Sequence, residues 1–347
     1  MIDDISIIKK EIISAINDIN LDLKGLTILT EAGSNLFLLT PIIACLSGAK
    51  KVYALSKTSK YGTFEEIKEQ LNRLSLLFEI DTSKIELFEK ENFHNFSEID
   101  IVTNLGHVRP IDEDFLRKLN KNAAISYMCE AWEHRQQDLD LELCKKYNIP
   151  VFATNEEHPL VNCFRETGLI ALQMIFESKI SLIDSHVCII SRDKFGKEIF
   201  KQVEKFTKNA HLINNFERID EYKNFKNLDL LIIADYLYED YIISTNGLVN
   251  PGLLKDLFPH VKIIQYCGKN NLEQIIENKI PVFPKAELEA VRMYKTLADI
   301  SYKALIRLLT AGLKVGEGIC RAKKLNLSDN GIYDFMLKND YPVQEIS

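Results

Sequence analysis

The chain has 347 residues, of which 46% are hydrophobic, and a formal net charge of -7. This length is enough to bury two cores of ordinary domain size. The acidic balance argues against nucleic acid and membrane surfaces as partners, because both attract basic proteins. We therefore expect the partner to be a small-molecule substrate.

Cysteine usage and hydropathy predict a soluble cytoplasmic protein. The seven cysteines form no CxxC pair, so neither a disulfide framework nor a structural zinc site is predicted. No apolar run reaches the roughly 18 residues that span a bilayer. Met1 is followed closely by the acidic Asp3 and Asp4, whereas a signal peptide begins with a basic segment.

Residues 1–23 are expected to form a docking helix. Isoleucines recur at positions 5, 8, 12, 16 and 19, a spacing that places them on one helix face. Asp3 or Asp4 is available as the N-cap of this helix. No role in a functional site is expected for the segment.

From residue 24 the pattern changes to short apolar runs that alternate with helical stretches. This order predicts a parallel sheet with right-handed crossovers, and hence a cofactor-binding Rossmann-like domain over residues 24–177. Its strands are expected at 26–30, 51–55, 85–88, 99–104, 123–128 and 151–154. Its helices are expected at 36–46, 65–78, 113–119, 138–147 and 162–176.

A second Rossmann-like domain is expected over residues 178–286, with strands at 186–190, 230–234 and 261–265 and a helix at 196–206. The two series resemble copies. Ile125-Ser-Tyr127 corresponds to Ile264-Gln-Tyr266, and residues 149–152 and 280–283 both read Ile-Pro-Val-Phe. In this alignment the first copy carries eight additional residues after its strand, at about 129–136. Loops on a rigid scaffold commonly carry function.

Residues 287–347 are expected to form a crossing helix and a helical tail. Apolar residues recur at helical spacing over 287–313, which is expected to cross back to the first domain. Gly312, Gly316 and Gly318 are expected to loosen the helix, because each costs about 1 kcal/mol relative to alanine. A last helix is expected at about 332–337, in a tail without function apart from dimer contact.

The predicted fold is therefore α/β, with two Rossmann-like doubly wound parallel-sheet domains joined by crossing helices. The site is expected in the cleft between the two domains. A homodimer is expected from the frequency of dimers among soluble oligomers.

The turn after the first strand contains Glu31, Gly33, Ser34 and Asn35. A Rossmann domain directs backbone amides at a phosphate from this position. The GxGxxG fingerprint is absent, but one glycine still allows a tight turn, so these residues are candidates for cofactor binding. Ser34 and Asn35 capping the next helix is the alternative.

Two groups of basic residues occupy further positions where a Rossmann domain contacts a nucleotide. Ser56, Lys57 and Lys60 follow the second strand, where an NAD enzyme keeps an acid, and they favour the 2′-phosphate of NADP. Arg192 and Lys194 lie near the start of the helix expected at 196–206 in the second domain and are candidates to hold an anion. Solvated surface charges are the alternative for both groups.

The additional residues after the fifth expected strand are rich in functional side chains. Glu130 and His134 are candidates for acid–base catalysis, and Trp132, Glu133 and Arg135 for substrate binding. In the alternative interpretation Trp132 is a hydrophobic plug, and Glu133 and Arg135 form a solvated ion pair.

The loop after the fourth strand contains Gly106, His107 and Arg109. Gly106 allows the backbone to pass close to a ligand, so it is a cofactor-binding candidate. His107 and Arg109 are candidates to bind a carboxylate or phosphate, and histidine also exchanges protons near neutral pH. The alternative is a polar loop in which Arg109 pairs with Asp112.

The loop after the sixth strand contains Glu156, Glu157 and His158. Adjacent carboxylates raise the pKa of each other, and a neighbouring imidazole can exchange a proton with one of them. Glu157 and His158 are therefore candidates for catalysis, with helix capping before Asn162 as the alternative. Metal binding is the least favoured interpretation, because ligands from one tripeptide cannot all converge.

The first domain resembles the cofactor domain of the D-2-hydroxyacid dehydrogenase and S-adenosylhomocysteine hydrolase group. The resemblance is carried by residues 100–107, 113–119, 122–128 and 149–159. It implies NAD or NADP as cofactor, two domains with crossing helices, and a substrate-binding arginine in the loop between the last two strands. That arginine would fall near Cys129, so Arg135 is a shifted candidate. Asn162 and Cys163 stand where the group has a histidine.

Three functions are compatible with these features. The first is an NAD(P)-dependent oxidoreductase of a small polar carbonyl or hydroxyl substrate, with Arg109 or Arg135 binding an anion and His134 or His158 exchanging the proton. The second is an S-adenosylmethionine-dependent methyltransferase, because Glu31-Ala-Gly33 is similar to the acid-then-glycine turn of that family. The third is a noncatalytic nucleotide-binding or scaffold protein, because both glycine fingerprints are missing.

Overall fold

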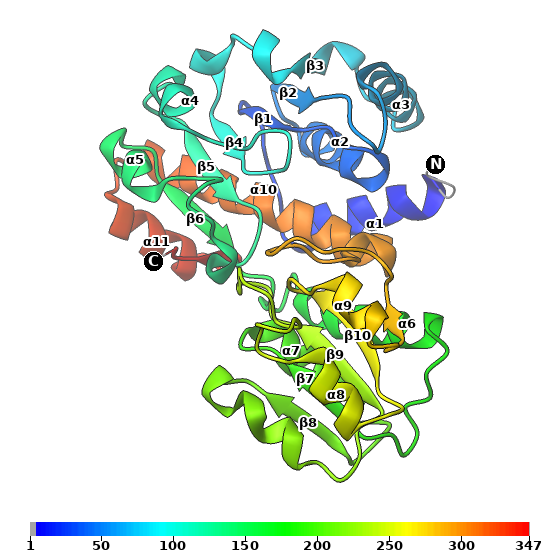
Figure 1. The fold of residues 1–347 in the computed structure, drawn as a ribbon. Coiled ribbons are helices and arrows are strands. Elements are labelled where there is room, and N and C mark those ends of the chain that lie inside the picture. Colours follow the sequence, from blue (N-terminus) through cyan, green and yellow to red (C-terminus); the bar gives the residue numbers. More distant parts are fainter. Residues whose placement is uncertain (1–4, 347) are drawn as a thin grey trace. The chain divides into compact units, whose positions relative to one another are not determined.

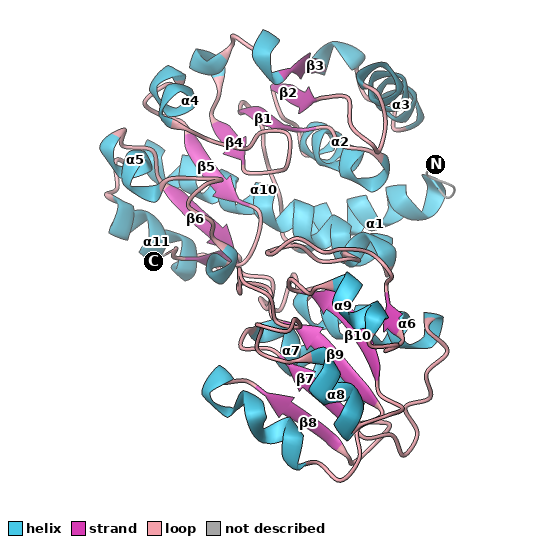
Figure 2. Ribbon diagram, in the orientation of Figure 1, coloured by secondary structure: helices cyan, strands magenta, loops and turns pink. Residues whose placement is uncertain are grey.

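The structure is a computed structural model that describes residues 5–346 (Figure 1). The expected N-cap candidates Asp3 and Asp4 lie outside the described residues. The chain forms two compact units, the first made of Met1–Cys163 with Tyr302–Ser347 and the second of Phe164–Ser301. Each unit contains a sheet of mainly parallel strands with helices packed on it, so the predicted α/β class is confirmed (Figure 2).

The first unit contains a seven-stranded sheet in the order β12-β6-β5-β4-β1-β2-β3. All neighbours pair in parallel except β12, which is antiparallel to β6. Without β12 the order is that of a Rossmann domain, with its switch point between β1 and β4. The strands are β1 (Thr27–Glu31), β2 (Lys51–Ser56), β3 (Ile85–Glu89), β4 (Ile101–Thr103), β5 (Ala124–Tyr127), β6 (Val151–Thr154) and β12 (Val343–Gln344).

The first unit contains seven α-helices among the described residues, and α10 differs most from the helix expected from the sequence. The α-helices are α1 (Ile5–Asp18), α2 (Leu39–Leu46), α3 (Phe64–Leu77), α4 (Glu113–Lys118), α5 (Leu141–Lys146), α10 (Tyr302–Lys324) and α11 (Asp329–Lys338). Short 3-10 turns are η1 (Asn35–Leu38), η2 (Thr82–Lys84), η3 (Lys90–Asn92), η4 (Phe96–Glu98) and η5 (Ala131–Glu133). The expected helix at 36–46 is therefore an α-helix only from Leu39 onward.

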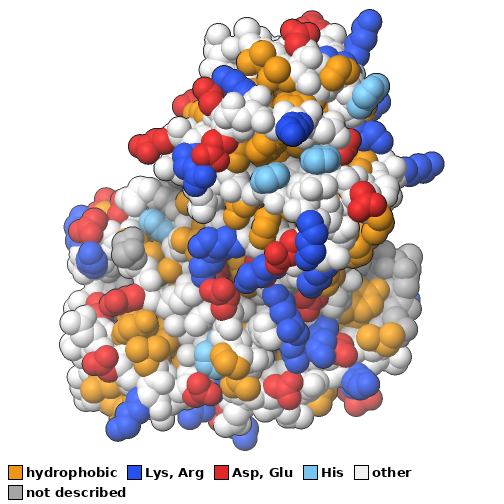
Figure 3. Space-filling model, turned by 90° about the horizontal axis from the view of Figure 1, so that it is seen from below, with side chains coloured by type: hydrophobic (Ala, Val, Ile, Leu, Met, Phe, Trp, Pro, Cys, Tyr) orange, Lys and Arg blue, Asp and Glu red, His pale blue; other side chains and the backbone are white. Residues whose placement is uncertain are grey.

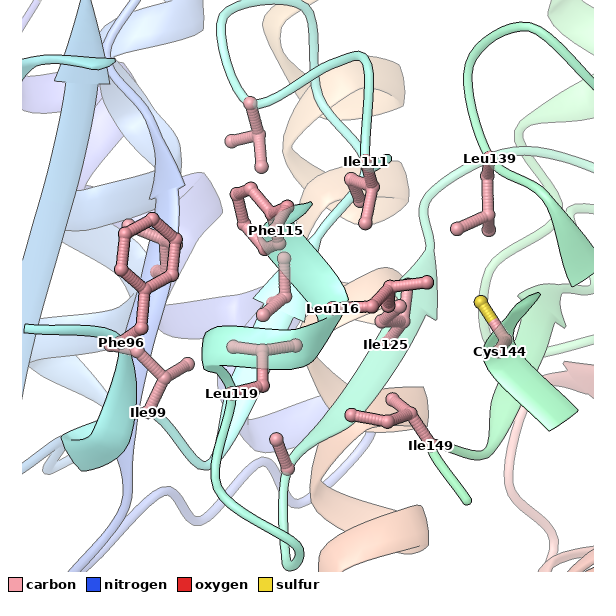
Figure 4. Close-up of a cluster of buried hydrophobic side chains, with 14 of the residues drawn as sticks. Phe96, Ile99, Ile111, Phe115, Leu116, Leu119, Ile125, Leu139, Cys144 and Ile149 are labelled. Atoms are coloured by element: carbon pink, nitrogen blue, oxygen red, sulfur yellow. The ribbon is translucent and has the colours of Figure 1, made fainter. Parts of the chain in front are cut away.

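Helices α4 and α5 cover one face of the first sheet. Phe115 and Leu116 of α4 and Cys144 of α5 are buried against Ile125 of β5 (Figure 4). The rings of Phe96 and Phe115 meet edge to face with their centroids 5.0 Å apart. Burial of such apolar surface contributes about 25 cal/mol per Å², so this core fixes the strands whose ends carry the candidate site.

Helix α10 packs against β4, β5 and β6 and also contacts α1, α2 and α11. The expectation of a helix over 287–313 loosened by glycines is wrong in both respects. The helix begins only at Tyr302, and it continues through the glycines to Lys324. A Cβ on Gly312 would lie 2.1 Å from the Met128 Sδ, and one on Gly316 would lie 2.6 Å from Ile101 Cγ2. Close packing against the sheet explains these glycines.

The second unit contains a five-stranded parallel sheet in the order β11-β10-β9-β7-β8. This is the doubly wound order in which the first and third strands flank the switch point, here β7 and β9. The strands are β7 (Val187–Ile190), β8 (Ala210–Ile213), β9 (Leu230–Ala234), β10 (Lys262–Cys267) and β11 (Val282–Phe283). The helices are η6 (Phe164–Glu166), α6 (Thr167–Glu177), α7 (Lys194–Val203), η7 (Phe216–Asn224), α8 (Pro251–Leu257), α9 (Leu272–Glu277) and η8 (Leu297–Asp299).

Helix α6 groups with the second unit, whereas the sequence analysis placed residues 162–176 at the end of the first domain. The hydroxyl of Tyr266 in β10 donates to the Thr167 carbonyl at 3.1 Å. A Cβ on Gly168 would lie 2.5 Å from the carbonyl oxygen of Glu198 in α7. These contacts, formed with residues far along the chain, decide the grouping of the helix.

Strand pairing shifts the alignment between the two series by one residue. Ile125 pairs with Val151 in the first sheet, and Ile263, not Ile264, pairs with Val282 in the second. From Ile125 to Pro150 is 25 positions and from Ile263 to Pro281 is 18, so the first connection is longer by seven residues. Short apolar segments do not determine a strand register, because a shift of one residue still aligns apolar residues with apolar residues. An internal structural repeat of the two series stays a prediction.

No helix among residues 5–346 is long and apolar enough to cross a membrane. On the face shown in Figure 3, Lys and Arg side chains lie among Asp and Glu side chains. A homodimer stays a prediction.

Candidate functional site

The carboxyl ends of β1 and β4 place Glu31 beside the loop that contains Gly106 and His107. Glu31 is the last residue of β1, and its Oε2 accepts a hydrogen bond from the His107 amide at 3.0 Å. A Cβ on Gly106 would lie 2.9 Å from the same oxygen, so a larger residue there would displace the Glu31 carboxyl group from its present position. The buried carboxyl group of Glu31 therefore links the two loops at the switch point, where α/β proteins bind ligands.

Burial shapes the charges of this cluster. It raises the pKa of Glu31, against the opposing effects of the His107 amide and of Arg109. It also lowers the pKa of His107, and the positive charge of Lys57 lowers that pKa further. The imidazole is therefore neutral at pH 7, and a neutral imidazole can accept a proton. The pairing of β1 with β2 places Lys57, two residues after Leu55, at the same edge of the sheet.

Two candidate substrate-binding residues, Arg109 and Arg135, share one carboxylate. Arg109 NH1 lies 2.8 Å from Asp138 Oδ2, and Arg135 NH2 lies 2.6 Å from the same oxygen. The alternative pairing of Arg109 with Asp112 is wrong, because Asp112 instead caps α4 by accepting from the Phe115 amide. Asp138 thus joins the 129–136 loop to the loop after β4 and holds both guanidinium groups near the switch point.

Glu130 holds three segments together. Its buried carboxylate accepts from the Glu156 amide at 2.9 Å and from Gln344 Nε2 at 3.2 Å. Gln344 Oε1 in turn accepts from the Ala131 amide at 3.0 Å. The tail expected to lack function therefore supplies strand β12, which fixes the loop after β5. The sequence gives no local signal for this pairing, because Gln344 lies 214 positions from Glu130.

Two hydrogen bonds to backbone carbonyls hold this partly buried loop in place. His134 Nε2 lies 2.8 Å from the carbonyl oxygen of Leu139. Because a carbonyl only accepts, this nitrogen carries the proton and Nδ1 is the remaining ring nitrogen. The Tyr127 hydroxyl donates to the Glu133 carbonyl at 3.0 Å, and Trp132 stands between them in the chain. These bonds give the loop a defined conformation.

His158 and Glu157 lie after β6, with β5 between this strand and β4 in the sheet. His158 Nε2 lies 3.1 Å from Asp340 Oδ1, and the Glu157 residue is exposed. The Asn155 amide donates to the Pro342 carbonyl at 2.9 Å. The described hydrogen bonds thus connect this candidate pair to the C-terminal segment, whereas those of His107 connect it to β1.

The cofactor candidates at the ends of β1 and β2 are adjacent because Glu31 pairs with Leu55. Ser34 precedes η1, but its side chain makes no capping hydrogen bond, so the alternative interpretation of Ser34 as a side-chain cap is wrong. Asn35 has a φ of 53°, in the left-handed region that asparagine tolerates. The Gly33 amide donates to the Phe37 carbonyl at 3.3 Å and is thereby turned into the loop.

Ser56 ends β2 and is buried, yet its Oγ has no hydrogen-bond partner within residues 5–346. A buried hydroxyl without a partner is costly, by about 1–3 kcal/mol. Lys57 follows it with an exposed side chain. A ligand with hydroxyl or phosphate oxygens at the end of β2 would satisfy both groups.

In the second unit, sequence reasoning identified Arg192 and Lys194 but missed Asp193. Arg192 Nε and NH2 donate to the two oxygens of Asp235 at 2.9 and 3.0 Å. Lys194 Nζ lies 5.7 Å from the ring centroid of Phe164. Asp193 caps α7 by accepting from the Phe195 amide. The available signal was the spacing Ser191-x-Asp193-x-x-Gly196, which has acid and serine at two of the glycine positions of GxGxxG.

All seven cysteines are free thiols. Among residues 5–346 no group of three or more His, Cys, Asp or Glu side chains is arranged to hold a metal ion.

No protein-family model matches the chain, and a search of curated proteins gave no match. Solved structures of similar fold include a dipicolinate synthase subunit from Bacillus halodurans, with 8% identity, coverage of 83% of this chain and 96% of that one, and a TM-score of 0.52. They include the pyruvate reductase of Chlamydomonas reinhardtii, with 10% identity, coverage of 88% and 98%, and a TM-score of 0.51.

A third, the NAD+-bound 3-phosphoglycerate dehydrogenase of Entamoeba histolytica, has 12% identity, coverage of 87% and 96%, and a TM-score of 0.44. At these identities the likenesses show the fold alone. In fold, the likenesses to the dipicolinate synthase subunit and to the pyruvate reductase confirm the predicted resemblance to the D-2-hydroxyacid dehydrogenase group.

Proposed function

We propose that the chain is an NAD(P)-linked oxidoreductase of a small polar carbonyl or hydroxyl substrate. The observation that carries the proposal is the cluster of Glu31, His107, Arg109 and Lys57 at the β1/β4 switch point of a sheet in Rossmann order. The pyruvate reductase of similar fold is named for a substrate of this class. That support is an analogy of fold, and the chemistry of the site residues is independent of it.

The end of β2 supports a nucleotide with a 2′-phosphate, hence NADP in preference to NAD. Ser56 offers a buried hydroxyl that lacks a partner within residues 5–346, and Lys57 offers an exposed ammonium group. An acid, which would repel a phosphate, is absent from residues 56–60. When bound, the nicotinamide ring supplies or accepts the hydride. The Gly33 amide is already bonded to Phe37, so the fit rests on the side chains at β2.

We assign proton exchange with the substrate oxygen to His107. Its depressed pKa makes it a neutral base at pH 7, and the Glu31 bond to its amide fixes the backbone at this position. His134 and His158 were favoured by the sequence, but Nε2 of each ring is engaged, by the Leu139 carbonyl and by Asp340 respectively. They are assigned positioning roles, as is Glu130. The expected location between the two domains stays a prediction.

Arg109 is assigned to bind a carboxylate or another anionic group of the substrate. Guanidinium groups bind such anions with two parallel hydrogen bonds. Asp138 holds Arg109 through one nitrogen, NH1, which leaves the others for a ligand. Arg135 shares Asp138 and therefore supports the orientation of Arg109.

Thermal shifts of the full chain with NAD, NADP, S-adenosylmethionine and S-adenosylhomocysteine test this proposal. A larger shift with NADP than with NAD is the expected result. A shift with only the two sulfur compounds would establish the second candidate, a methyltransferase, which is favoured by the burial of Glu31 two residues before Gly33. A shift with none of them would favour a noncatalytic scaffold. Mass identification of any copurified ligand provides an independent check.

A further inference from the structure

The second unit has a turn at the position equivalent to the Glu31 turn. The Ser191 amide donates to the Ile213 carbonyl as the Ala32 amide donates to the Leu55 carbonyl. Since both acceptors pair with the last residue of the first strand, Ser191 aligns with Ala32. A Cβ on Gly196 would lie 2.4 Å from the Ser191 Cβ, so Gly196 meets the packing requirement of the third glycine in GxGxxG. The turn thus keeps part of the architecture of a dinucleotide site.

The carboxylate of Asp193 takes up the donors that a phosphate would use in this turn. Its Oδ1 accepts from the Phe195 amide at 2.9 Å and from the Ser191 hydroxyl at 3.0 Å. Its Oδ2 accepts from the Tyr236 amide at 2.6 Å, which joins the turn to the loop after β9. Phosphates bind at such a helix N-terminus through the same kind of amide. An anion that belongs to the chain already occupies this position.

The cation that precedes Asp193 in the chain, Arg192, is also engaged. Arg192 donates to Asp235 through its amide, Nε and NH2, at 2.8, 2.9 and 3.0 Å. Its guanidinium carbon lies 4.0 Å from the ring centroid of Phe216 and 5.2 Å from that of Tyr238. A bidentate pair stacked on aromatic rings holds the guanidinium in one orientation. A phosphate at this turn would have to displace both acids.

We propose that Asp193 is a built-in substitute for phosphate: it closes the second unit to nucleotides, and its removal creates an anion site at the β7/β9 switch point. The nucleotide of the proposed function is thereby confined to the first unit, with one bound per chain. The exclusion of nucleotides from the second unit is argued from the contacts of Asp193 and Arg192 alone, so it holds whether or not the first unit binds a nucleotide.

Chemical rescue of the full-length Asp193→Gly variant tests the proposal. Its melting temperature is measured in sodium formate and in sodium pyrophosphate, each against sodium chloride at equal ionic strength. We expect the variant to melt below the wild type and to gain about 2 °C or more from either anion beyond the effect of chloride. Asp112→Gly is the matched control, because Asp112 caps α4 at an exposed position through one amide, and no gain is expected there.

Two results of the rescue experiment would overturn the proposal. An equal gain in the wild type would reveal an open anion site, and a folded Asp193→Gly protein without any gain would show that the carboxylate does not stand in for an anion. A variant that does not fold is replaced by the next measurement.

Hydrogen–deuterium exchange of the wild-type chain and of Asp193→Asn, which keeps the side-chain volume, is measured with NADPH and with pyrophosphate. No protection is expected at residues 191–196 or 235–238 of the wild type, and protection there would overturn closure of the second unit. Protection at residues 31–38, 56–60 and 104–109 with NADPH tests the proposed function separately, so failure of one is distinguishable from failure of the other.

Discussion

The first βα turns of the two units use a carboxylate in the same way but leave different groups around it. In each turn, the acid accepts a hydrogen bond from a backbone amide across the switch point. Glu31 accepts from His107, in the loop after β4, and Asp193 accepts from Tyr236, in the loop after β9. The acids come from different positions, since Glu31 ends its strand and Asp193 caps the following helix. A carboxylate bridge is therefore compatible with either an open or a closed site.

The difference lies in the neighbouring side chains. The first turn has an imidazole at the bridging position and an exposed ammonium group at Lys57. The second has a tyrosine at the bridging position, and its arginine is bound to Asp235. Two doubly wound sheets thus present different side chains at their switch points. This is expected, because function depends on the residues of a site and not on the fold alone. Substitutions at equivalent positions of the two units test this contrast directly.

The largest effect is expected from His107→Gln. If His107 exchanges the proton, its replacement should lower kcat by about 100-fold or more, because general acid–base catalysis contributes roughly 10²–10⁴-fold. The affinity for NADPH should stay within about twofold, since the backbone bond to Glu31 is retained. Steady-state kinetics together with a nucleotide titration measure the two quantities.

Tyr236→Phe is the matched variant of the second unit, because the Tyr236 amide takes the equivalent place opposite Asp193. It should leave kcat unchanged. An equal loss in both variants, or full activity in His107→Gln, would remove the distinction between the two turns. A loss of kcat in His134→Gln alone would return the proton-exchange role to the loop after β5.

The second effect concerns the pH dependence of stability. Burial, supported by the charge of Asp235, raises the pKa of Asp193 from its usual 3.8 to about 6. The folded state therefore binds more protons than the unfolded state between these values, and stability falls as the pH rises through them. Asp193→Asn removes this titration. Between pH 4 and pH 7 the free energy of unfolding of this variant should rise by up to about 3 kcal/mol relative to that of the wild type, as measured by urea unfolding.

Two further variants sharpen the pH comparison. Glu31→Gln should also become more stable relative to the wild type as the pH rises, because burial raises the pKa of Glu31 as well. Glu113→Gln should move in the opposite direction, because hydrogen bonds from Lys146 and Tyr147 lower the pKa of Glu113. Parallel curves for wild type and Asp193→Asn would contradict the assignment of a buried, charged acid to the turn.

Local periodicity predicted most strands well, but it missed β8, β11 and β12 and gave no account of the distant contacts. Strand 230–234 was placed at its observed bounds, because continuous apolar runs bounded by polar residues are a local signal. The glycines of α10 were misjudged, since their helix penalty is local, whereas the approach of Met128 and Ile101 that requires them is not. Packing against the sheet outweighed the propensity.

The candidate site was predicted in its residue types and only partly in its connections. Gly106, His107 and Arg109 were identified because they follow a strand, and the structure joins them to Glu31 and Asp138. The bond between Glu130 and Gln344, and that between Asp193 and Tyr236, join residues 214 and 43 positions apart. Pairings at such separations depend on the folded topology, and no spacing rule in the chain reports them.

The third effect is expected at the end of β2. Lys57→Glu should weaken NADPH binding by about tenfold and NADH binding much less, because the new acid would repel a 2′-phosphate that NADH lacks. Fluorescence titration with both nucleotides measures the ratio. Asn215→Glu adds an acid at the equivalent position of the second unit, because Asn215 follows Ile213 by two residues as Lys57 follows Leu55, and it should change neither affinity. A similar loss for both nucleotides would argue against a 2′-phosphate at Lys57.

The smallest effect is expected from Ser56→Ala, at the end of β2 in the first unit. Ser56 Oγ is buried without a hydrogen-bond partner within residues 5–346, so its removal should leave the stability of the ligand-free protein unchanged or raise it. If the hydroxyl bonds to the nucleotide, NADPH affinity should fall by about threefold, which corresponds to a weak hydrogen bond of about 0.7 kcal/mol.

Ser47→Ala is the matched control for this last prediction, because Ser47 Oγ is likewise buried and unpartnered within the described part of the first unit but follows α2, away from the carboxyl ends of the strands. It should have the same effect on stability and none on affinity. Opposite changes of stability and affinity in Ser56→Ala alone identify a hydroxyl kept for a ligand. Unchanged NADPH affinity in both variants would instead show that the Ser56 hydroxyl does not contact the nucleotide.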